Sequence, residues 1–449
     1  MKCEISLTQG SLKKNILLFS LPLIFSNLLQ VLFNMTDIAV IGRFAGPIAL
    51  GAVGSTPMIL FFITGIIQGL GSGINAVVAY YIGANNKKDT EETIHTSAII
   101  SLIFGFILMI IGILLANWIL LLLNTKEELI QGACLYIRIY MLGMPAMAIY
   151  NYGNALLSAS GDTKRPLIYL AISGIINVFL NLIFVIYFKM TVAGVATATV
   201  ISQYISSILI LKALFKGTKD FKLEICKLKI TLSKCIKILK IGIPSGLQNS
   251  IYAFANLFIQ IGINSFDPIT IAGLSAAANA DPLVYDVMNA FYAACSSFIG
   301  QNFGAKNGLR IKRTFFIVAG YSLFISIFLG SFFFIFGEEF LGLFSKNQTV
   351  INAGLYRLKV MATTYWISVF MDTAISACRG LGKTLIPSII VILGSCVFRI
   401  LWVHTIFMHY RTIESLFLLF GFSWAITAIA ETIYFIIVYK TELKYLKNI

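Results

Sequence analysis

The sequence predicts an all-α polytopic membrane protein with twelve transmembrane helices in two six-helix bundles that are related by internal duplication. Of its 449 residues, 58% are hydrophobic and only 12% are charged, about half the charged share of an ordinary soluble domain. The apolar residues form long segments, and the second half of the chain repeats motifs of the first. These observations exclude a soluble globular protein, because each membrane span needs roughly twenty apolar residues.

The predicted spans are apolar segments separated by short polar breaks. Most exceed the length needed to cross the hydrocarbon, so we expect them to tilt or to protrude. They lie at 15–42, 50–81, 93–123, 130–158, 165–188, 191–215, 235–264, 271–302, 313–337, 352–378, 384–408 and 413–439.

The distribution of basic residues predicts the orientation. If both termini are cytoplasmic, the inner segments hold 25 of the 34 Lys and Arg residues and the outer loops and helix ends hold eight. Because cytoplasmic loops are enriched in these residues, we expect both ends to be cytoplasmic. Residues 1–33 resemble a signal peptide, but the polar Asn34 and Asp37 follow where small residues would mark a cleavage site, so we interpret this segment as the first span.

The chain is predicted to consist of an N-terminal lobe over 1–215, a basic cytoplasmic linker over 216–234 and a C-terminal lobe over 235–449. The lobes match at an offset of about 221 residues: Pro22 aligns with Pro244, and GDTKRP at 161–166 aligns with GKTLIP at 382–387. Six spans in each repeat give both lobes the same topology, as in carriers that rock one bundle against the other. The lysine-rich linker is expected to be a solvated loop near anionic lipid, in preference to a nucleic-acid site.

Asp37 is the strongest candidate for a functional side chain. A charge at the bilayer centre costs about 2.5–3.5 kcal/mol on insertion scales, so an acid within a span requires a reason. Asn34 lies one turn before Asp37 on the predicted helix, and the two share a face. Such a carboxyl group can hold a proton in apolar surroundings and release it when water or a cation arrives.

Other polar residues within spans are weaker candidates. Asn177 and Asn181 lie four residues apart on one face of span 5, where they either serve function or bond across helices. In span 8, two acids flank Pro282, which is expected to kink the helix. An interior ion-pair network is the alternative for the acids and arginine of spans 10 to 12. The secondary candidates of the C-terminal lobe are Asp281, Asp286, Asp372, Arg399 and Glu431.

The sequence gives no support for an enzyme, a resident cofactor or a metal centre. GLGKT at 380–384 resembles the end of a phosphate-binding loop, but Ala377 stands where that motif requires Gly, and no strand is expected before it. The seven cysteines stand singly, without CxxC spacing, beside only three histidines. Gly65, Gly69 and Gly73 form a face without side chains, which predicts close helix packing.

Several consecutive motifs resemble the MATE family, the multidrug and toxic compound extrusion transporters. The segment NMTDIAVIGRFAGPIALGAVGS (34–55) is similar to the family's first span. Blocks similar to those of the family follow in the expected order: GLGSGINAVVAYYIGANN (69–86), SGDTKRP (160–166), GVATATVISQ (194–203), FIGQNFGAKNGLRIK (298–312), CRGLGKTLIP (378–387), FRILW (398–402) and FSWAIT (422–427).

This resemblance implies a V-shaped pair of bundles that exports amphipathic organic cations in exchange for H+ or Na+. The family's coupling Asp of span 1 falls on Asp37, its span-5 pair on Asn177 and Asn181, and its span-6 Thr on Thr199. Many relatives have Asp where this chain has Asn181. Relatives with a sodium site in the C-terminal lobe use a Glu in span 7, but residues 235–264 contain no acid.

Both departures favour proton coupling through Asp37, with Asn34 in the same network, although amides and carbonyls beside Asp37 can also ligate Na+. We therefore expect a multidrug antiporter whose partners are small cations and membrane lipid, without nucleic acid. A flippase for lipid-linked precursors and a passive channel stay open as alternatives. The resemblance favours a monomer, and the Lys, Ile and Asn richness fits a bacterial plasma membrane.

Overall fold

The computed structural model describes residues 5–123, 125–217 and 221–447, within which every regular element is a helix. This confirms the all-α prediction. Among the described residues, eight spans are long and apolar enough to cross a membrane, or nine if a bent helix pair counts as one span. The remaining predicted spans correspond to three helices of 25 residues or more that are less apolar: α9, α11 and α14.

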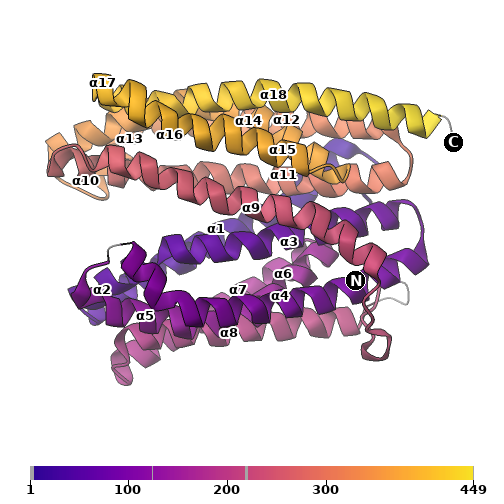
Figure 1. The fold of residues 1–449 in the computed structure, drawn as a ribbon, viewed down its shortest axis with the longest axis horizontal. Coiled ribbons are helices and arrows are strands. Elements are labelled where there is room, and N and C mark those ends of the chain that lie inside the picture. The colour runs from indigo at the N-terminus through magenta and orange to yellow at the C-terminus, as the bar shows by residue number, and fades with distance from the viewer. Residues whose placement is uncertain (1–4, 124, 218–220, 448–449) are drawn as a thin grey trace. The chain divides into compact units, whose positions relative to one another are not determined.

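The helices of the first half follow the predicted segments closely. They are α1 (Leu12–Phe44), α2 (Pro47–Gly54), α3 (Pro57–Gly83), α4 (Lys87–Leu122), α5 (Glu127–Met141), α6 (Met144–Ala159), α7 (Lys164–Leu182), the π-helical turn η1 (Ile183–Tyr187) and α8 (Thr191–Phe215), as Figure 1 shows.

The second half repeats this order after the short helical turn η2 (Ile225–Lys227). Its helices are α9 (Leu232–Ile263), α10 (Pro268–Ala278), α11 (Ala280–Gly304), α12 (Gly308–Ile335), α13 (Gly337–Gly342), α14 (Gln348–Gly380), α15 (Leu385–Val391), η3 (Ile392–Val397), α16 (Phe398–Trp402), η4 (Val403–Phe407), α17 (Met408–Tyr410) and α18 (Ile413–Lys447).

Several predicted spans are interrupted where proline occurs. Span 2 divides into α2 and α3 at Thr56, where Pro57 suits the first helical position because it lacks a backbone N–H. Span 4 bends by 48° between α5 and α6. In span 8 the break lies at Asn279, so Pro282 occupies the first turn of α11. Because Pro282 has no N–H to donate to the Ala278 carbonyl, the interruption at Asn279 agrees with the distortion expected at this proline.

Backbone geometry confirms the internal duplication. Asn86 and Asn307 each cap a helix by accepting a hydrogen bond from the backbone N–H three residues later. Left-handed residues also recur at a separation of 221 or 222 positions, at Asn85 and Lys306, Gly161 and Gly382, and Lys189 and Arg411. Because these conformations end helices, both halves place their turns at equivalent positions.

The described chain forms two compact units. One unit contains Leu21–Ser250, and the other contains Leu7–Ser20 together with the residues from Ile251 onward. The units divide within α1 and α9 and not at the linker, so the lobe boundaries at 215 and 235 stay a prediction from the repeat. Residues 218–220 of the predicted linker lie outside the described residues.

Glycines permit close packing of α3 against the start of α9 within the first unit. A Cβ atom at Gly69 would overlap the backbone of Gly246, and one at Gly73 would meet the backbone at Ile238 and Gly242. The predicted packing face of α3 is therefore confirmed.

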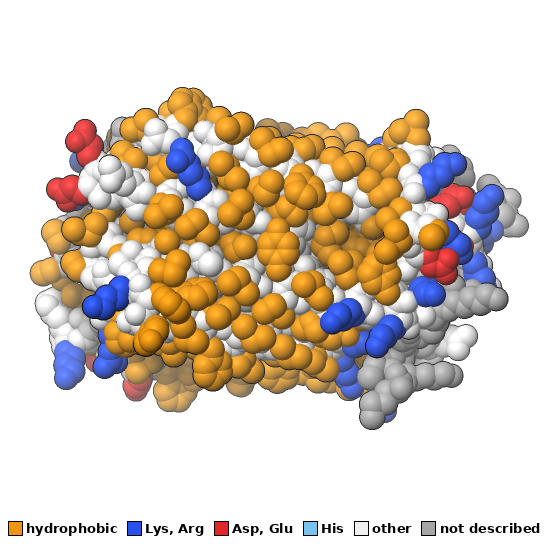
Figure 2. Space-filling view, turned by 90° about the horizontal axis from the view of Figure 1, so that it is seen from below, with side chains coloured by type: hydrophobic (Ala, Val, Ile, Leu, Met, Phe, Trp, Pro, Cys, Tyr) orange, Lys and Arg blue, Asp and Glu red, His pale blue; other side chains and the backbone are white. Residues whose placement is uncertain are grey.

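The surface agrees with a protein that spans a membrane. On the face drawn in Figure 2, hydrophobic side chains cover the middle, whereas Lys, Arg, Asp and Glu gather toward the two ends. Exposed large apolar side chains occur along most long helices. In water such a surface would associate, but in a bilayer it contacts acyl chains.

Candidate functional site

Asp37 lies in a buried polar cluster built from α1, α7 and α8. The Asn181 side-chain amide donates a hydrogen bond of 2.5 Å to Oδ1 of Asp37, and it also donates to Oδ1 of Asn177 over 3.2 Å. The Thr199 hydroxyl lies 3.4 Å from Oδ2 of Asp37, and the Asn177 amide lies 3.4 Å from the same hydroxyl. Four of the five predicted site residues are thus together.

The hydrogen-bond inventory leaves acceptors free in this cluster. Both amide hydrogens of Asn181 are used, while its Oδ1 has no partner among the described residues. The single hydroxyl hydrogen of Thr199 is better placed for the Val195 carbonyl, at 2.9 Å, than for Asp37 at 3.4 Å. Oδ2 of Asp37 therefore has at most a weak donor, and it can accept a proton or a cation.

The surroundings of Asp37 contain no cation within ion-pair distance in the part of the chain that the structure describes. Asp37 itself is 9% exposed, and the neighbouring Val40 and Ile41 belong to a hydrophobic core. The Asp37 carboxylate therefore has no counterion from the described chain, so an exchangeable ion can neutralise its charge.

Two features of this cluster were not predicted. Tyr136 and Tyr140 on α5 lie in the neighbourhood of Asp37. Their spacing of four residues in YIRIY was the available signal, because it places both rings on one helix face. In addition, α7 continues as the π-helical turn η1 directly after Leu182, next to Asn181. Such turns often occur at functional sites because they widen the helix locally.

Asn34 stands apart from the cluster. It lies one turn before Asp37 on α1, but its side chain is exposed, and no hydrogen bond among the described residues links it to Asp37. Sharing a helical face did not place both side chains in the interior.

In the second unit, Asp281 is held by two partners from α14. Arg357 forms an ion pair of 2.6 Å with Oδ2, and the Tyr365 hydroxyl donates to Oδ1 over 2.5 Å. Arg357 also donates to the Leu274 carbonyl over 2.8 Å. Asp281 is therefore neutralised within the fold. Asp286, one turn further along α11, is half-buried and contacts Asn289.

Arg399 is fully buried and surrounded by aromatic rings. Its guanidinium lies 4.4 Å from the Phe420 ring centroid and 4.8 Å from that of Tyr252. It donates to the Tyr252 hydroxyl over 2.9 Å and to the Ser423 hydroxyl over 3.2 Å. Ring faces thus provide part of the stabilisation that a carboxylate would otherwise supply.

Asp372 and Glu431 do not pair directly with Arg399. Neither acid belongs to an ion pair within 4.0 Å among the described residues. Asp372 interacts at longer range with Arg379 and Arg399. Glu431 is fully buried, and neither of its carboxylate oxygens has a hydrogen-bond partner in the described chain. The direct ion-pair network suggested by the sequence is therefore absent from these residues.

Comparison with known proteins gives a consistent result. The MatE family model matches residues 22–183 and again residues 244–403, two stretches that begin 222 residues apart. This double match follows the internal duplication seen in the backbone.

Individual relatives cover most of the chain. It is 28% identical over 360 residues to the probable multidrug resistance protein YpnP of Bacillus subtilis, with 80% of each chain covered. It is 24% identical to the probable multidrug resistance protein NorM of Thermotoga maritima, over 84% of this chain and 82% of that protein. A solved outward-facing structure of a multidrug resistance MATE family transporter has a TM-score of 0.90 at 22% identity, covering 100% of this chain and 99% of that one.

Proposed function

The chain belongs to the MatE family of membrane transporters, and on this premise we propose that it exports amphipathic organic cations in exchange for inward-moving H+. The observation that carries the proposal is Asp37, a buried carboxylate that has amide and hydroxyl neighbours but no cationic partner in the described chain. The multidrug names of its relatives support the cargo class.

The exchange cycle depends on competition for one carboxylate. When the site faces the cytoplasm, ionised Asp37 favours a cationic drug. When it faces outward, proton entry neutralises Asp37, which weakens drug binding and releases the drug. The drug binds only when Asp37 is ionised, and the proton binds only when the drug has left. This mutual exclusion provides the differential affinity that exchange requires. Asn181 holds the carboxylate in place, and Asn177 and Thr199 complete the polar cluster around it.

Sodium coupling is the second candidate, and one observation favours it. Oδ1 of Asn181, which has no hydrogen-bond partner among the described residues, and the Asp37 carboxylate both offer oxygen ligands, which hard cations prefer. A flippase for anionic lipid-linked precursors has less support. It would require free basic side chains deep in the spans, but Arg357 is paired with Asp281 and Arg399 is held by aromatic rings.

The proposal places the transporter as a monomer in a bacterial plasma membrane with both termini cytoplasmic. The excess of basic residues in the inner segments and the bacterial relatives support this placement. The proposed transport needs no resident cofactor, since the gradient of the coupling ion supplies the energy.

Proteoliposomes test the coupling ion. Movement of a fluorescent organic cation is followed under an imposed pH gradient, an imposed Na+ gradient, or neither. The proposal expects transport with the pH gradient alone. Transport with Na+ alone would establish the sodium alternative, and movement of a labelled lipid-linked precursor in place of the dye would establish the flippase.

A further inference from the structure

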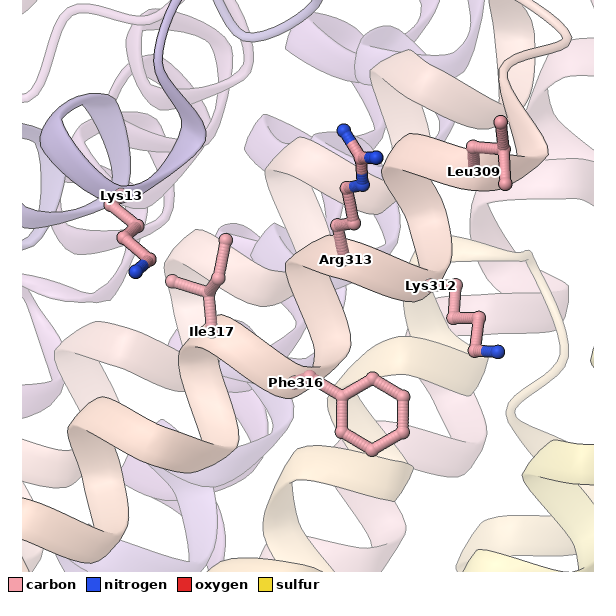
Figure 3. Close-up of a pocket in the computed structure, with 6 residues that line it drawn as sticks. All are labelled: Lys13, Leu309, Lys312, Arg313, Phe316 and Ile317. Carbon is pink, nitrogen blue, oxygen red and sulfur yellow. The ribbon is translucent and has the colours of Figure 1, made fainter.

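An open groove of about 450 Å³ lies within the second unit, where the first turns of α1 and α12 meet. Figure 3 shows Lys13 extending from α1 toward the turn of α12 that carries Ile317, with the other lining side chains projecting from neighbouring turns of α12. The lining residues are Lys13, Leu309, Lys312, Arg313, Phe316 and Ile317.

The groove carries uncompensated positive charge. Lys13, Lys312 and Arg313 are exposed, the lining contains no acid, and none of the three forms an ion pair with a described residue. Arg310 adds a fourth positive charge that interacts with Arg313. Like charges on one surface repel one another, so this basic surface favours an anion.

Arg310 is not available to such an anion. Its guanidinium donates to the carbonyl of Gly10 over 3.1 Å and to that of Gln9 over 3.3 Å. The Tyr321 hydroxyl donates to the Lys13 carbonyl over 3.3 Å. These contacts hold the start of α1 against α12, so the three remaining cations are placed by the fold itself.

The rest of the lining is apolar and continuous with the lipid-facing side of α12. Leu309 is 71% exposed and Phe316 is 61% exposed, and Phe324 and Phe328 continue the exposed apolar face along this spanning helix. The groove therefore joins a cationic end to a hydrocarbon-facing surface. A ligand that satisfies both parts has an anionic head and an apolar chain.

We propose that this groove binds an anionic phospholipid of the surrounding leaflet. The phosphate contacts Arg313, with Lys13 and Lys312 as further positive charges on either side, and an acyl chain lies along Phe316 toward the middle of α12. An arginine guanidinium can bind phosphate through two parallel hydrogen bonds, and lysine adds point charge. Basic side chains at the end of a spanning helix are well placed to reach headgroups. The lipid would join α1 to α12 at this end of the unit.

Native mass spectrometry of the full chain in detergent tests the proposal with three probes: phosphatidylglycerol, phosphatidylcholine and inorganic phosphate. We expect phosphatidylglycerol to be retained preferentially. The double variant Lys312→Gln and Arg313→Gln should bind it about tenfold more weakly, since each basic residue near an anionic headgroup contributes substantially. The matched control is Lys87→Gln with Lys88→Gln, which removes the same charge from an exposed pair in the first unit and should leave retention unchanged.

The apolar wall has its own pair of variants. Phe316→Ser should weaken retention of phosphatidylglycerol, whereas Phe324→Ser, which changes an equally exposed ring on the same helix outside the groove, should not. Equal retention of the two lipids, equal losses in test and control variants, or displacement of phosphatidylglycerol by inorganic phosphate at similar concentration would each overturn the proposal.

Discussion

The side-chain amide of Asn181 donates a hydrogen bond of 2.5 Å to Oδ1 of Asp37, joining α7 to α1 across 144 residues of sequence. This bond uses one amide hydrogen, Asn177 receives the other, and the Asn181 carbonyl oxygen is left without a described partner. Asn181 thus orients the carboxylate without neutralising it. The proposed exchange depends on that combination.

Asn181→Ala should reduce pH-driven transport about tenfold or more, because the Asp37 carboxylate loses its shortest hydrogen bond and its fixed orientation. Initial rates in proteoliposomes measure the effect. The matched control is Asn75→Ala, which removes an interior amide that donates to the Ala155 carbonyl over 3.1 Å in the same unit. Equal losses in both variants would contradict a specific role for Asn181.

Asn181→Asp should change the stoichiometry of exchange. With one carboxylate, one H+ exchanges for one monovalent cation, so each pH unit supports about tenfold accumulation and membrane potential has no effect. A second carboxylate would admit a second proton, raise accumulation toward about a hundredfold per pH unit and make transport sensitive to potential. Steady-state accumulation under valinomycin-clamped potentials measures both quantities. A wild type that already responds to potential would contradict coupling through one carboxylate.

The sequence was sufficient to predict the spans because long apolar segments leave little choice of structure. It was also sufficient to group Asp37 with Asn181, since the resemblance supplied a register between α1 and α7. It did not predict the pairing of Asp281 with Arg357, because the two residues lie 76 positions apart on different helices and no motif relates them. The exposure of Asn34 was also not predicted. Helical periodicity shows which residues share a helix face, but it does not show which part of that face a neighbouring helix covers.

Gly69→Ala should destabilise the protein by about 1–3 kcal/mol, as overpacking typically does. A Cβ atom at this position would overlap the backbone of Gly246 on α9, which cannot move aside as a flexible side chain can. Gly320→Ala on α12 is the control, because nothing lies within 4 Å of its added Cβ atom. Thermal unfolding in detergent should show a lower Tm only for the first variant, and equal Tm values would contradict the close contact.

Docking of the linker onto α4 should depend on pH. Lys227 bonds to Glu91 over 2.8 Å and to Glu224 over 3.1 Å. The hydrogen bond from Lys227 lowers the pKa of Glu224, and the bonds to Glu91 and Glu224 raise the pKa of Lys227. Because the pKa of Glu224 is lowered, its ionised form stabilises the folded linker at neutral pH, and this stabilisation is lost as the pH falls through the carboxyl range. Because the pKa of Lys227 is raised, its contribution is lost only when the pH rises through that pKa. The ion pair between Lys227 and Glu91 joins the linker to α4, so docking should weaken in acid below about pH 4, where carboxyl groups take up protons.

A spin label on Cys226, an exposed free cysteine of the linker, reports this docking. In a chain where Cys226 is the only reactive thiol, the label should be immobilised at neutral pH and become mobile in acid. In Glu91→Gln, which removes the α4 carboxylate that Lys227 contacts, the mobility at neutral pH should already be raised. A label that is equally mobile at all pH values in both proteins would show that these ion pairs do not hold the linker.

The central claim is that Asp37 couples proton entry to cation export. The most direct test compares wild type with Asp37→Asn in proteoliposomes under an imposed pH gradient, at equal protein content and after equal Tm values have shown that both are folded. The account predicts that wild type accumulates the cation against its gradient and that Asp37→Asn does not. Accumulation by Asp37→Asn at the wild-type level would contradict the account.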